Sequence, residues 1–221
     1  MLQLFYAPVC PFAQRARALL EHLEFPYVPR LVDLEQRDPE LLQLSPTGLV
    51  PLLMEDGLEG LSGGPFVLYE SAVIAEFLIE RAAWQDAYPG GLALRYQQRL
   101  AMKRFDDLLV PLHYRSMRDP SSLSEADIAE IQVEVARLAE LVELLGGHHE
   151  NALAFHVAPF WARMSWMGAH APMLSLLVES DIVRFWMDRC LEVPAIRRTL
   201  PDRDQTVQNY LKKLAGEPRN G

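Results

Sequence analysis

Residues 6–23 have the sequence YAPVCPFAQRARALLEHL and place a cysteine, Cys10, directly before Pro11. Apolar side chains recur at helical spacing after Pro11, which predicts a helix over 11–23 with Arg15 and Arg17 on its surface. Proline suits the first position of a helix, because the N–H group that it lacks would have no partner there. Cys10 is therefore predicted to cap the N-terminus of this helix.

The surrounding residues predict an α/β domain over 1–83. Short apolar runs between turn residues are typical of strands, whereas the 3.6-residue period is typical of helices. We expect strands at 2–6, 27–31, 50–54 and 66–69, and helices at 11–23, 39–44 and 70–81. A glycine-rich turn at 57–64 is expected to join the last two strands into a hairpin. The predicted order is βαβ, then a helix, then ββα.

The second half of the chain is predicted to be an all-α domain over 92–216. A boundary rich in proline and glycine, 84–91, separates it from the first domain. We expect helices at 92–117, bent near Pro111, and at 124–145, 151–170, 181–191, 194–200 and 205–214. Pro159 predicts a kink or a late start in the third of these helices.

Composition restricts the classes of function. The 221 residues carry a net charge of −9, which argues against binding to a nucleic-acid backbone. No apolar run approaches the roughly 20 residues of a membrane span, and the N-terminus shows no export signal. With two cysteines the chain is not a disulfide scaffold, so a reducing cytoplasm is the expected location.

A thiol at a helix N-terminus faces unpaired N–H groups and the positive end of the helix dipole. Such a position can lower a cysteine pKa from about 8.5 to about 3.5–7.5 and so favour the thiolate. An inert cysteine at a strand end explains the position of Cys10 equally well if that position is taken alone.

Two other positions could hold a ligand. If the Val50–Pro51 bond is cis, the backbone of Val50 can pair with a peptide-like ligand, although most prolines at strand starts are structural. Ser71 is a plausible helix N-cap whose N–H groups suit a carboxylate, and Glu70 could accept hydrogen bonds from an ammonium group. An ordinary acidic helix start is the simpler interpretation of Glu70 and Ser71 alone.

Together, CPFAQR, GLVPLL and YESAVIAEFL resemble the cytosolic glutathione transferases, and within them the omega class; related bacterial transferases share this arrangement. The resemblance covers nearly the whole chain and implies a glutathione transferase fold, with a thioredoxin-like N-terminal domain and an all-helical C-terminal domain. It implies glutathione as co-substrate, no metal, a small electrophilic or disulfide second substrate, a homodimer, and no nucleic-acid or membrane partner.

The resemblance also implies roles for individual residues. Cys10 would form a mixed disulfide with glutathione, Val50 and a cis Pro51 would contact its cysteinyl part, and Glu70 and Ser71 would hold its γ-glutamyl end. The remaining candidates in the glutathione site are Phe12, Leu34 and, for the glycyl carboxylate, Arg37. A pocket for the second substrate could take side chains from Tyr114, Met117, Phe160 and Trp161.

These expectations favour a glutathione-dependent thiol transferase or dehydroascorbate reductase. The alternative is a non-catalytic binding protein of the same fold, such as a stringent-starvation-type regulator of RNA polymerase; such proteins generally lack the cysteine. The stretch from His148 to Glu150 is expected to be a solvated turn and not a metal site, and Cys190 a buried inert thiol. Asn151 can cap the third helix of the second domain, although Ala154 stands where the family usually has an aspartate.

Overall fold

The computed structural model describes residues 1–34, 36, 38–60 and 63–215. By its internal contacts the chain divides into two compact units. The first comprises Met1–Trp84 and Pro194–Pro201, and the second comprises Gln85–Val193 and the residues from Asp202 onward. The expected all-α domain, 92–216, included Pro194–Pro201, whereas the contacts of this segment lie with the first unit.

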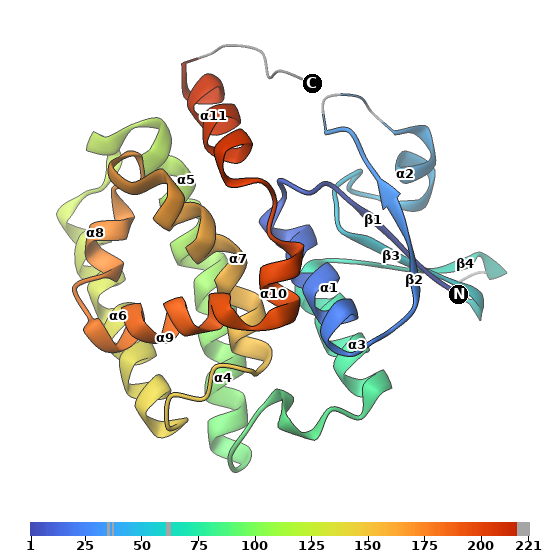
Figure 1. Cartoon of the computed structure of the whole chain (residues 1–221), viewed down its shortest axis with the longest axis horizontal. Coiled ribbons are helices and arrows are strands. Elements are labelled where there is room, and N and C mark those ends of the chain that lie inside the picture. The colour runs from blue at the N-terminus through green and yellow to red at the C-terminus, as the bar shows by residue number, and fades with distance from the viewer. Residues whose placement is uncertain (35, 37, 61–62, 216–221) are drawn as a thin grey trace. The chain divides into compact units, whose positions relative to one another are not determined.

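The first unit is built on a four-stranded sheet with strand order β2-β1-β3-β4 (Figure 1). Its strands are β1 (Leu2–Tyr6), β2 (Tyr27–Leu31), β3 (Leu52–Glu59) and β4 (Pro65–Tyr69). β1 pairs with β2 in parallel and with β3 antiparallel, and β3 and β4 form an antiparallel hairpin. The first unit therefore has the thioredoxin-like βαβ-α-ββα order that the sequence predicts.

Three of the helices described in this unit follow the prediction for it, and the fourth, α10, was predicted as part of the second domain. They are α1 (Pro11–His22), α2 (Pro39–Leu44), α3 (Ser71–Ala82) and α10 (Pro194–Thr199). Helices α1 and α3 contact each other, and α10 packs against α1 (Figure 1). On α1 the Gln14 side chain donates hydrogen bonds to the Ile196 carbonyl and to Thr199 Oγ1, both at 3.4 Å. These bonds explain why a segment late in the sequence belongs to the first unit.

The hairpin differs from its predicted form. β3 continues to Glu59, into the range that the glycine content predicted to be turn, and its register shifts between Glu55 and Glu59. Gly57 has a φ of 85°, a conformation that glycine adopts without a steric cost. One glycine inside the strand is therefore accommodated by an irregular register, and the strand does not end there.

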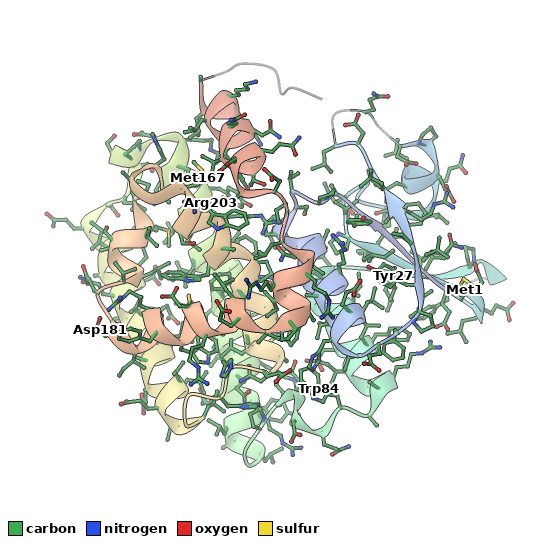
Figure 2. All side chains as sticks on the ribbon, viewed as in Figure 1. Met1, Tyr27, Trp84, Met167, Asp181 and Arg203 are labelled. Carbon is green, nitrogen blue, oxygen red and sulfur yellow. The ribbon has the colours of Figure 1, made fainter. Side chains whose placement is uncertain are left out.

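The second unit is helical. Its helices are α4 (Leu92–Arg104), α5 (Val110–Arg118), α6 (Glu125–Leu144), α7 (Ala152–Met167), α8 (Met173–Leu177), α9 (Asp181–Glu192) and α11 (Arg203–Leu214). Figure 2 draws the side chains on these helices, with Met167 labelled at the end of α7 and Arg203 at the start of α11. No helix in the described ranges is both long and apolar enough to cross a membrane.

The predicted long helix at 92–117 is present, but a π-helical segment, Phe105–Leu109, lies between α4 and α5. The proline ring at 111 would collide with a carbonyl one turn earlier in a regular α-helix. A wider turn relieves such a collision, and here the N–H of Val110 bonds to the carbonyl of Phe105. Pro159, in contrast, lies inside α7, and the helix runs through it from Ala152 to Met167.

Candidate active site

Cys10 is the N-cap residue of α1, as predicted. Its backbone is extended, with φ −79° and ψ 116°, and Pro11 is the first helical residue. The Cys10 N–H bonds to the Ala7 carbonyl at 3.0 Å, and the Cys10 carbonyl accepts from the Gln14 N–H at 3.0 Å. The side chain is partly buried. The thiol is thus carried by the residue at which the N–H groups of the helix begin.

The backbone of Val50 lies beside this thiol. Cys10 Sγ donates to the Val50 carbonyl oxygen at 3.8 Å, although the two residues are 40 positions apart. Both belong to one apolar cluster, in which Val50 packs with Phe5, Ala7 and Leu52 and Cys10 lies at its edge. The Val50–Pro51 peptide bond is cis, as the resemblance to the glutathione transferases implies. Two of the predicted site elements therefore meet at atomic contact.

The third element, Glu70-Ser71, lies where β4 gives way to α3. Ser71 was expected to be the N-cap, but Glu70 holds that position and Ser71 is the first helical residue. Glu70 has φ 68° and ψ 111°, a conformation that is rare for a residue with a Cβ. Backbones held in such sparsely populated regions are concentrated at ligand-binding and active sites. Glu70 is exposed and Ser71 is buried.

Sequence reasoning placed Arg15 on the helix surface, which is wrong. Arg15 is 1% exposed, and its guanidinium Nη1 donates to Ser71 Oγ at 3.2 Å. Its Cζ atom lies 5.0 Å from the centroid of the Phe12 ring. The spacing could have revealed this burial, because Arg15 lies four residues from both Pro11 and Leu19, which are buried on α1.

Two predicted glutathione contacts are less well defined. Leu34 lies between β2 and α2 and is 47% exposed, so its side chain is available to a ligand. Arg37, the candidate for the glycyl carboxylate, lies outside the described residues.

The four candidates for a second-substrate pocket lie in the second unit. The Tyr114 and Phe160 rings meet edge to face, with centroids 6.5 Å apart, and Phe160 makes the same kind of contact with Phe105 at 5.5 Å. Trp161 Nε1 donates to Asp188 Oδ1 at 2.9 Å. Met117, Phe160 and Trp161 are buried, whereas Tyr114 is half-buried. Among these four, Tyr114 offers the most surface to a ligand.

The remaining residues singled out in the sequence, Cys190 and the stretch from His148 to Glu150, lie in the second unit. Burial raises the pKa of the Cys190 thiol, which is 0% exposed on α9. The His148 carbonyl accepts from Asn151 Nδ2 at 3.0 Å and from Trp186 Nε1 at 2.9 Å, which ties down the loop before α7. Desolvation lowers the pKa of His149. In the part of the chain that the structure describes, no three His, Cys, Asp or Glu side chains are grouped to hold a metal.

The geometry of the first unit thus combines three chemical capacities. A thiol at a helix N-terminus can ionise and attack sulfur. A backbone carbonyl beside it can receive an N–H group of a peptide ligand. The start of α3 offers N–H groups and a hydroxyl to a carboxylate.

Comparison with known proteins identifies relatives of this chain. The family model described as "Glutathione S-transferase, N-terminal domain" matches residues 4–86. Pyrimidodiazepine synthase of Drosophila melanogaster is 32% identical over 231 aligned positions, covering 99% of this chain and 88% of that protein. Glutathione S-transferase omega-1 of Sus scrofa is 26% identical over 216 positions, covering 89% and 79%. The crystal structure of glutathione transferase Omega 1C from Trametes versicolor superposes with a TM-score of 0.76 at 19% identity, covering 97% and 96%.

The chain belongs to the glutathione S-transferase superfamily. Within that superfamily its similarity is to proteins of the omega class, as the sequence motifs predict.

Proposed function

We propose that this protein is a glutathione-dependent thiol transferase in which Cys10 forms a mixed disulfide with glutathione. The observation that carries the proposal is the position of Cys10. This residue caps the N-terminus of α1, and its Sγ lies 3.8 Å from the carbonyl oxygen of Val50. Members of other classes use a hydroxyl side chain to ionise glutathione. A cysteine instead bonds to its sulfur, so conjugation of electrophiles is expected to be slow.

The reaction consists of two thiol–disulfide exchanges. The Cys10 thiolate attacks the glutathione sulfur of a glutathionylated substrate, forming the Cys10–glutathione disulfide and releasing the substrate thiolate, which takes up a proton. A second glutathione, as thiolate, then attacks the glutathione sulfur of that disulfide, which releases oxidised glutathione and restores the Cys10 thiolate. The N-terminus of α1 favours the Cys10 thiolate both as the attacking group of the first exchange and as the leaving group of the second.

The ligand is placed by the same elements. The Val50 backbone pairs with the cysteinyl part of glutathione, and the first turn of α3 binds the γ-glutamyl carboxylate, with Glu70 accepting from the ammonium group. Phe12 and Leu34 line the site, and Arg37 remains the candidate for the glycyl carboxylate. Tyr114 is the preferred contact for the second substrate, since its ring is half-buried.

The test is the glutathione-dependent reduction of hydroxyethyl disulfide and of dehydroascorbate by the wild type, Cys10→Ala and Cys190→Ala. We expect Cys10→Ala to be inactive and Cys190→Ala to keep full activity, because Cys190 is 0% exposed. Mass spectrometry should find one glutathione adduct, on Cys10. Equal activity in Cys10→Ala and wild type would exclude the mechanism. No activity and no retention on immobilised glutathione would favour a binding protein of this fold.

Assembly as a homodimer is part of the proposal. On α4, Leu92, Tyr96 and Leu100 lie four residues apart and are 74%, 63% and 52% exposed, so one face of this helix presents an apolar stripe to solvent. Clusters of exposed apolar side chains mark association surfaces. Sedimentation velocity should give the mass of a dimer, and a concentration-independent monomer would contradict this assignment.

A further inference from the structure

The start of α1 and the start of α3 are linked by one buried side chain, Arg15. Its guanidinium donates to Ser71 Oγ at 3.2 Å and lies over the Phe12 ring. At 1% exposure, Arg15 is among the largest fully buried side chains of the protein. Burying a guanidinium costs free energy unless its N–H groups form hydrogen bonds. The hydrogen bond to Ser71 is therefore part of what stabilises Arg15 in this buried position.

The direction of this hydrogen bond determines what Ser71 can do. Arginine has five N–H donors and no acceptor, so the Ser71 oxygen must be the acceptor. A serine hydroxyl has one hydrogen to donate, and that hydrogen cannot point at Arg15. The hydroxyl hydrogen of Ser71 is therefore available to an acceptor on another side of the oxygen. The adjacent positive charge of Arg15 makes this hydroxyl a stronger donor.

We propose that Arg15 is a positioning residue for glutathione: it fixes the Ser71 hydroxyl so that its hydrogen is donated to the α-carboxylate of the γ-glutamyl group. This inference rests on the proposed function, because it assigns a role within the same glutathione site. The carboxylate is held by the N–H groups at the start of α3 and by a hydroxyl oriented from behind. The same guanidinium connects the helix that carries Cys10 to the helix that binds the carboxylate.

The experiment measures the Kd of S-methylglutathione, which cannot form a disulfide, by calorimetry. A second ligand is the same compound with hydrogen in place of the γ-glutamyl α-carboxyl group. The variants are Arg15→Gln, Ser71→Ala, the double variant, and Arg17→Gln as a matched control. Arg17 is on the same helix and lies 5.1 Å from the Tyr6 ring centroid.

Arg15→Gln and Ser71→Ala should each raise the Kd of S-methylglutathione by about tenfold to a hundredfold, the range for a lost hydrogen bond to a charged group. The double variant should bind no more weakly than the weaker single variant, because both changes remove one arrangement. The ligand without the carboxyl group should bind all these proteins with the same Kd. Arg17→Gln should match the wild type with both ligands.

Arg15→Lys covers the case in which Arg15→Gln does not fold, since it keeps the charge and most of the buried stem. It should lose affinity for S-methylglutathione only, and by a smaller factor. Wild-type affinity in the Arg15 variants, or an equal loss for both ligands, would overturn the inference while leaving the proposed function intact. A wild type that binds neither ligand would overturn both.

Discussion

The N-terminus of α7 offers a quantitative test of how this fold is stabilised. Asn151, which is 0% exposed, makes two hydrogen bonds there. Its Oδ1 accepts from the Ala154 N–H at 2.9 Å, and its Nδ2 donates to the His148 carbonyl at 3.0 Å. One side chain therefore caps the helix and anchors the loop that precedes it.

Asn151→Ala should lower the free energy of unfolding of the second unit by about 2–3 kcal/mol. Loss of an N-cap costs about 0.5–2 kcal/mol in general, and a buried N–H left without a partner costs about 1–3 kcal/mol. Ala154 is fully buried, so the upper part of the cap range applies. The His148 carbonyl adds little, because Trp186 Nε1 still donates to it at 2.9 Å.

The matched control is Ser124→Ala at the exposed N-cap of α6. Ser124 accepts from the Asp127 N–H at 3.2 Å, but water can replace it, so the loss should be about 0.5–1 kcal/mol. Asn151→Ser, which keeps an oxygen acceptor, should recover part of the stability lost in Asn151→Ala.

The assay is urea unfolding followed by tryptophan fluorescence, because Trp161, Trp166 and Trp186 all lie in the second unit. For a chain of this size, the expected loss corresponds to a fall in Tm of about 4–12 °C. If Asn151→Ala loses no more stability than Ser124→Ala, the buried cap has no special weight and this reasoning is refuted.

Two other predictions concern buried titratable groups. Desolvation lowers the pKa of His113 from 6.5 to about 4, so the unfolded chain binds this proton more tightly than the folded chain does. The free energy of unfolding should therefore have its full value above pH 6.5 and fall by about 3 kcal/mol as the pH drops to about 4. His113→Leu should abolish this part of the pH dependence in urea titrations at several pH values, and an unchanged slope would contradict the assignment. Ellman's reagent should modify one thiol per native chain, Cys10, and two after unfolding, because Cys190 is 0% exposed and burial raises its pKa. Rapid modification of Cys190 in the native protein would show that α9 is less tightly packed than described.

Much of the fold could be predicted because local patterns and local structure agree. β1, β2 and α2 have the predicted bounds, and proline at the first helical position placed the start of α1 and with it Cys10. The missed elements depend on context. α8 is five residues long, too short for a helical period to show, and the π-helical segment is a response to the proline at 111.

Local sequence patterns also predicted several residues of the candidate site, but this prediction missed Arg15. Cys10, Val50 and Ser71 each lie at or just before the start of a helix or strand, where turn and cap residues mark a change of structure. Arg15 lies inside a helix, and the charge of its side chain suggested solvent exposure. Only the packing of α1 against α3 shows that this arginine points inward, because sequence periodicity does not specify the partner of a helix face.

The return of Pro194–Pro201 to the first unit has a consequence for synthesis. A ribosome releases β1 to α3 early, yet α10, which covers part of α1, is translated after nearly the whole of the second unit. Until α10 is synthesised, the face of α1 around Gln14 stays exposed in the nascent N-terminal unit. Chaperones bind such exposed surfaces and proteases cleave such incompletely folded chains. Messages truncated before codon 194 should yield chains that are degraded, even though these chains contain every residue predicted to contact glutathione.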